Sequence, residues 1–182
     1  MSSPLTTPGQ TVGPFFGQGL PYPGDSELVP AGRADAIRLH GLVLDGAGAP
    51  IPDAMVEIWQ AGPDGAVPRA EGSLHRDGWT FTGWGRASTD LRGHYAFTTV
   101  VPGATDEGRA PFFAVAVFAR GLLDKLFTRI YLPGHPDNAT DPLLTALDEA
   151  ERGTLVALAE PVGLRFDIYL QGERETVFLR HG

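Results

Sequence analysis

Glycine and proline punctuate this chain too often for a bundle of long helices. There are 24 glycines and 16 prolines among 182 residues, without the repeat of a collagen. Short runs of apolar and β-branched residues recur between them, which is typical of strands. We expect eight strands, near residues 37–44, 54–60, 79–84, 94–101, 112–119, 126–132, 164–170 and 176–179. This pattern predicts an all-β fold, a β-sandwich or barrel of short strands, and we favour the sandwich.

Two regions depart from the strand pattern. Residues 1–35 are rich in Pro, Gly, Thr and Ser, and we expect an extended N-terminal arm without a helix. We predict that this arm packs on a partner subunit, with packing on its own domain as the alternative, and that residues 36–182 form the sandwich. One short surface helix is expected between the N-cap Asp141, followed by Pro142, and the stop at Gly153.

Composition excludes several classes of protein. The absence of cysteine rules out disulfides, thiolate metal sites and cysteine nucleophiles. A net charge of −8 without a basic stripe disfavours nucleic-acid binding. The chain shows no signal peptide and no apolar run of about 18 residues, so we expect a cytoplasmic protein with no membrane partner.

The sequence contains no self-contained active site that spacing alone can identify. Five histidines are present, and no two lie two to five residues apart as paired metal ligands usually do; they are His40, His75, His94, His135 and His181. Ser73 lies in Gly72-Ser73-Leu74, which lacks the second glycine of a nucleophile elbow. Arg120 ends an apolar run, where an arginine either extends to solvent or binds an anion.

A set of motifs along almost the whole chain resembles one enzyme family. Among them are Glu57-Ile58-Trp59-Gln60 and Phe118-Ala119-Arg120-Gly121. The others are residues 7–14, 85–90, 93–97, 102–103, 128–131 and 165–168. In order and spacing they resemble the intradiol ring-cleavage dioxygenases. The resemblance implies a β-sandwich, two related subunits in a mixed oligomer, and a non-haem ferric ion held by two tyrosines and two histidines.

The same resemblance implies that this chain holds no iron. The positions that correspond to the four ligands are Val67, Thr105, Phe112 and Ala114. Three of these side chains have no donor atom and threonine is a poor ligand, so we expect an apolar, metal-free pocket here. The chain is then the non-iron (alpha) subunit, without catalytic residues of its own, and Fe(III) is held by the homologous beta subunit.

The resemblance also assigns this chain a role in its partner's site. It is closest to the family members that cleave protocatechuate with dioxygen. In these, the arm and one arginine of the non-iron subunit line the partner's substrate pocket. The corresponding residues are Thr11, Gly13, Pro14 and Phe15 of the arm, and Arg120, which would hold the carboxylate of protocatechuate.

Two other interpretations remain open at this point. The chain could be a metal-free binding or structural protein of transthyretin-like type. It could also be a stand-alone dioxygenase with another ligand set, which would need His75, His94 and Tyr95 to converge. Arg109 falls near an active-site arginine of the iron-bearing subunit, and we expect a vestige or a local salt bridge there.

Overall fold

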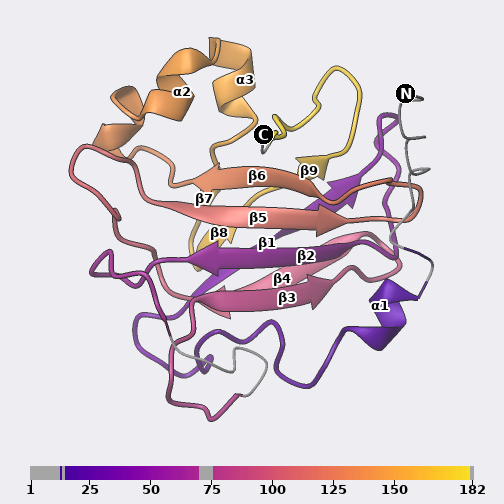
Figure 1. Ribbon diagram of the computed structural model, residues 1–182, viewed down its shortest axis with the longest axis horizontal. Helices are drawn as coiled ribbons and strands as arrows, with labels where there is room; N and C mark the ends of the chain where they lie inside the picture. Colours follow the sequence, from indigo (N-terminus) through magenta and orange to yellow (C-terminus); the bar gives the residue numbers. More distant parts are fainter. Residues whose placement is uncertain (1–12, 14, 70–75, 181–182) are drawn as a thin grey trace, which may run out of the picture.

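Two β-sheets pack face to face in the computed structural model, which describes residues 13, 15–69 and 76–180 (Figure 1). One sheet has the order β4-β1-β8-β7, with β9 pairing on β1, and the other has the order β3-β2-β5-β6. The strands are β1 (Ile37–Leu44), β2 (Met55–Gln60), β3 (Trp84–Ser88), β4 (His94–Thr99), β5 (Phe112–Phe118), β6 (Leu126–Tyr131), β7 (Leu158–Glu160), β8 (Gly163–Arg165) and β9 (Ile168–Tyr169). The β-sandwich predicted from the sequence is therefore confirmed.

The main core lies between the two sheets and follows the alternation of each strand. In β2, Val56 and Ile58 point inward and are fully buried, whereas Trp59 is half exposed. Leu39 of β1 and Phe113 of β5 are buried in the same core. Inward-facing side chains from both sheets thus hold the sandwich together by the burial of apolar surface.

Several expected strands differ from those in the structure. Residues 79–83 form no strand, because the Asp77 carboxylate accepts hydrogen bonds from the N–H groups of Trp79 and Thr80 and holds a turn; β3 begins only at Trp84. The expected strand 164–170 is split into β8 and β9. Between them, the Asp167 side chain takes the hydrogen bond of the Leu42 N–H at 3.0 Å.

Two further differences concern the C-terminal third. No named strand covers residues 176–179, where Leu179 makes only an isolated bridge to Phe127. Strand β7, at the edge of the first sheet, was not expected. Its three residues are mostly exposed, so their sequence carries little hydrophobic pattern.

The helix expected after Asp141 forms as two short helices. These are α2 (Pro142–Ala146), with Asp141 as the predicted N-cap, and α3 (Glu149–Gly153), preceded by a 3-10 turn at Pro136–Ala139. Leu147 is extended, and Asp148 then starts α3 with a capping box to Glu151. No helix in the described part of the chain is long and apolar enough to cross a bilayer.

The arm packs on its own sandwich from Phe16 onward. It contains a single helical turn, α1 (Phe16–Gly19), where no helix was expected. Phe16, Leu28 and Val29 are buried, and the Leu28 N–H donates to the Thr98 carbonyl of β4 at 2.9 Å. Contact of the arm with a partner stays a prediction.

A second, small core is organised by one buried carboxylate. Asp141 is completely buried and accepts hydrogen bonds from the Leu143, Leu144 and Ala110 N–H groups and from the Tyr131 hydroxyl. The bonds link the start of α2 to β6 and to the chain entering β5. Asp141 therefore ties the helical region to the second sheet.

We expect Asp141→Ala to lower the free energy of unfolding by about 3 kcal/mol, since it removes a helix cap and leaves several buried hydrogen-bond donors without an acceptor. Chemical denaturation monitored by circular dichroism measures this change. Asp148→Ala is the matched control: it removes the exposed cap of α3 and should cost only about 1 kcal/mol. Equal effects of the two substitutions would contradict the central role of Asp141.

Candidate functional site

The four positions that the resemblance assigned to metal ligands lie around one hollow. Val67, Thr105, Phe112 and Ala114 all line this space of about 190 Å³, which we call the β5 hollow. Its other walls are Trp59, Gln60, Ala61, Pro68, Gly103 and Pro111. The fold thus brings together Val67 and Ala114, which are 47 positions apart in the sequence.

Strand alternation and a close contact of two loops build the β5 hollow. Phe112 and Ala114 are alternate residues of β5, and Ala114 pairs with Trp59 of β2. The loops after β2 and β4 meet at Gly103, whose N–H donates to the Gly62 carbonyl at 2.8 Å. A Cβ on Gly103 would lie 2.5 Å from the Pro63 carbonyl oxygen, so glycine is required for this approach.

The Gln60 and Thr105 side chains of the β5 hollow already form hydrogen bonds. The Gln60 amide donates to the carbonyls of Ala61 and Val100, and its oxygen accepts from the Thr99 hydroxyl. The Thr105 hydroxyl donates to Asp106 at 3.1 Å. A ferric ion needs several oxygen or nitrogen donors, and these side chains do not supply them, so the residues present do not fit the family's iron.

The alternative ligand set does not converge either. His94 and Tyr95 are neighbours in β4 and point to opposite faces of the sheet, because side chains alternate along a strand. The Tyr95 hydroxyl is buried and donates to the Phe166 carbonyl at 2.7 Å. Burial raises the pKa of this phenol, which opposes the phenolate form that a metal would need. His75 lies outside the described residues.

Spacing along the chain missed one pair of histidines. Pairing of β1 with β4 brings His40 Nδ1 within 3.4 Å of His94 Nε2. His40 Nε2 is 2.9 Å from Glu160, and burial, with Arg38 second, lowers the pKa of His94. The pair lies on the outer face of the first sheet. Within the described ranges, no three His, Asp or Glu side chains form a group that could hold a metal ion.

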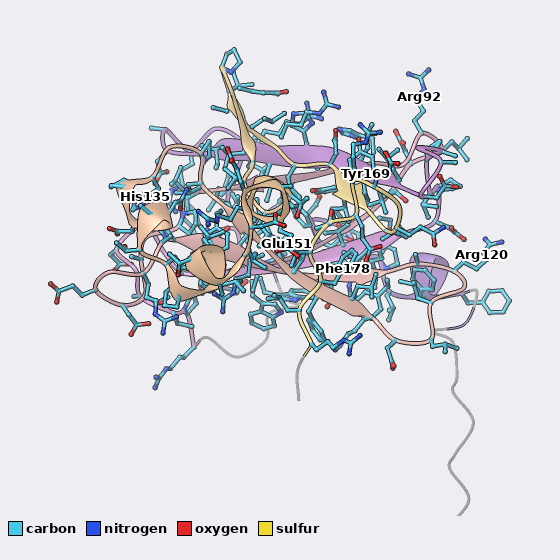
Figure 2. All side chains as sticks on the ribbon, turned by 90° about the horizontal axis from the view of Figure 1, so that it is seen from above. Arg92, Arg120, His135, Glu151, Tyr169 and Phe178 are labelled. Atoms are coloured by element: carbon cyan, nitrogen blue, oxygen red, sulfur yellow. The ribbon has the colours of Figure 1, made fainter. Side chains whose placement is uncertain are left out.

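Arg120 lies at the other end of β5 from the hollow. Its side chain is 69% exposed and forms an ion pair with Asp53. Figure 2 shows it projecting outward at the end of the molecule where α1 lies. Phe112 and Arg120 are eight residues apart along an extended segment, on the order of 25 Å. One small ligand therefore cannot contact both Arg120 and the β5 hollow of the same chain.

Two of the four arm residues predicted for the site can be placed. Phe15 is 72% exposed and directly precedes α1, and Gly13 has a φ of +79°, a conformation that favours glycine. Thr11 and Pro14 lie outside the described residues. Helix α1, which follows Phe15, lies at the same end of the sandwich as Arg120.

An ion pair between two residues of the sequence motifs anchors the end of α1. The motifs themselves gave no sign of this role. Arg86 of β3 contacts Glu57 of β2 through two nitrogens, at 2.6 and 2.9 Å from one carboxylate oxygen. Its third nitrogen donates to the carbonyl of Leu20, at the end of α1, at 2.7 Å. Both charged side chains are largely buried. Arg86 thereby fixes the end of α1 on the second sheet.

Arg109 does not form the local salt bridge that was one of its two expected roles. It is exposed, and across the described ranges no acidic side chain pairs with it.

Comparison with known proteins identifies the family. The Dioxygenase family model matches residues 12–172. The chain is 37% identical to the protocatechuate 3,4-dioxygenase alpha chain of Burkholderia cepacia, over 98% of both chains. It is 32% identical to the beta chain from the same organism, covering 78% of this chain and 67% of the relative.

A solved structure shares the fold over nearly the whole chain. It is the dioxygenase domain of a dioxygenase–carbohydrate-binding protein fusion from Streptomyces sp. SirexAA-E. The TM-score is 0.62 with 28% identity, covering 91% of this chain and 98% of that one. Together with the family match and the curated relatives, this shows that the chain belongs to the intradiol ring-cleavage dioxygenase family, on the side of the alpha chains.

Proposed function

We propose that this chain is the non-iron alpha subunit of a protocatechuate 3,4-dioxygenase and forms one wall of the substrate pocket of a homologous, iron-bearing beta subunit. The observation that carries the proposal is the separation along β5. The family's ligand positions at one end carry side chains that cannot hold iron, while α1 of the arm and Arg120 both lie at the other end. A role in a neighbour's site accounts for both.

The relatives support the pairing of two different chains. Curated alpha and beta chains of one organism's protocatechuate 3,4-dioxygenase are both similar to this chain, the alpha chain more closely. The names of these relatives imply a mixed oligomer. This chain would then contribute binding and assembly, and its partner the metal.

The proposed reaction consumes dioxygen and opens the ring of protocatechuate between its two hydroxylated carbons, giving 3-carboxy-cis,cis-muconate. The partner's ferric ion supplies that chemistry. In this chain, the Arg120 guanidinium pairs with the substrate carboxylate, Gly13 and Pro14 allow close backbone approach to a flat ring, and Phe15 excludes water beside it. Thr11 completes the wall, and no residue of this chain transfers a proton.

Purified alone, the chain should be colourless, bind no stoichiometric iron and lack ring-cleavage activity. Co-expression with the beta partner should give a coloured complex that consumes oxygen with protocatechuate. Metal analysis, visible absorption and an oxygen electrode measure these three properties. A ferric ion held tightly by the isolated chain, with a tyrosinate absorption band, would contradict the proposal.

In the complex, Arg120→Ala should raise the KM for protocatechuate about 10- to 100-fold, the worth of one charge-assisted hydrogen bond or ion pair. The KM for catechol, which lacks the carboxylate, should change much less. Steady-state oxygen uptake with both substrates gives the comparison.

Arg109→Ala is a matched control, since Arg109 is another exposed arginine that precedes β5 at the end away from Arg120. It should leave both KM values unchanged. Equal effects of Arg120→Ala on the two substrates would refute the carboxylate role.

A further inference from the structure

We propose that Asp53 is a positioning residue that orients Arg120 toward the substrate carboxylate; this inference rests on the proposed function. Asp53 lies in the turn between β1 and β2, far from Arg120 in the sequence. Its Oδ2 atom is withdrawn from solvent, has no hydrogen-bond partner, and faces the Arg120 guanidinium in an ion pair. In the described part of the chain, this is the one ion pair that either residue forms.

The turn that carries Asp53 is held rigidly on both sides. The Ile51 N–H donates to the Val43 carbonyl at 2.9 Å. The Thr89 hydroxyl donates to the carbonyls of Ile51 and Ala54, and the Thr89 N–H also bonds Ala54, which is completely buried. The backbone that carries Asp53 is therefore held in a fixed place on the sandwich.

Arg120, by contrast, has little else to restrain it. It lies in the turn after β5, followed by Gly121 at a φ of +90°, and most of its side chain is exposed. A guanidinium has five N–H donors, so contact with Asp53 through one nitrogen leaves donors free for a second carboxylate. A side chain that is already oriented loses less conformational freedom when the ligand binds.

The arm packs against the same turn. A Cβ on Gly17 of α1 would lie 3.7 Å from the Asp53 carbonyl oxygen, so α1 packs on the backbone of this residue. The two features assigned to the partner's pocket, Arg120 and the arm, thus share one support. The arm contacts the backbone of Asp53, whereas Arg120 contacts its carboxylate. A substitution of the Asp53 side chain therefore tests the contact with Arg120 and leaves the contact with the arm in place.

The test uses the complex with its beta partner and compares protocatechuate with catechol. Asp53→Asn keeps the volume of the side chain and removes its charge. It should raise the KM for protocatechuate about 3- to 10-fold, with the KM for catechol and both kcat values little changed. Asp53→Glu, which restores the charge, should recover part of the loss. In the Arg120→Ala background, Asp53→Asn should have no further effect, because the two residues act as a unit.

Asp35→Asn is the matched control, since it breaks the exposed Arg33–Asp35 ion pair elsewhere on the chain and should change neither KM. Thermal melting and gel filtration verify folding and assembly of each variant. If Asp53→Asn does not assemble, Asp53→Glu decides: it displaces the carboxylate by one methylene, and a KM ratio of the two substrates equal to that of the wild type overturns the inference.

The outcomes separate this inference from the proposed function. If Arg120→Ala affects protocatechuate selectively but Asp53→Asn leaves its KM unchanged or lowers it, Asp53 does not position Arg120, while the proposed function stands. If Arg120→Ala affects both substrates equally, the carboxylate role fails and the inference fails with it. Selective, non-additive effects of both substitutions support both.

Discussion

Strands β2 and β5 pair in antiparallel register from Met55 opposite Phe118 to Gln60 opposite Phe113. Two ends of the molecule take their chemistry from this pairing. One end holds the β5 hollow, where Trp59 pairs with Ala114. At the other end, Asp53 lies just before β2 and Arg120 lies just after β5. Side chains along a strand point to the same face at every second residue. A slip of one residue between β2 and β5 would therefore turn Phe112 and Ala114 toward the core and remove them from the wall of the hollow.

Much of the sandwich could be predicted because its central strands are half buried. The runs at 54–60, 112–119 and 126–132 are apolar enough to predict strands, and the structure has β2, β5 and β6 there. Two of the failures arose where side chains replaced ladder bonds. Asp77 holds a turn before β3, and Asp167 interrupts the strand after β8. Such bonds depend on local geometry that hydrophobic periodicity does not reveal.

The candidate site was predictable only in part, for a related reason. Resemblance placed Val67, Thr105, Phe112 and Ala114 at equivalent positions, and the structure brings them together. The contacts between His40 and His94, and between Asp53 and Arg120, arise from strand pairing and from two turns at one end of the sandwich. Residues 54 or 67 positions apart give no sign of such contacts in one sequence. Only the three-dimensional arrangement reveals these two contacts, because the spacing of the residues along the chain does not.

The side chains around the β5 hollow also bear on how this subunit matures. Where a fold gathers metal ligands, metal binding contributes to the folding free energy, and the empty protein is correspondingly less stable. At these positions this chain has valine, phenylalanine, alanine and a threonine already bonded to its neighbour. Its stability comes instead from apolar packing and from the hydrogen bonds of Gln60. If this chain is the non-iron subunit, as proposed above, its folding equilibrium does not depend on how much iron the cell contains.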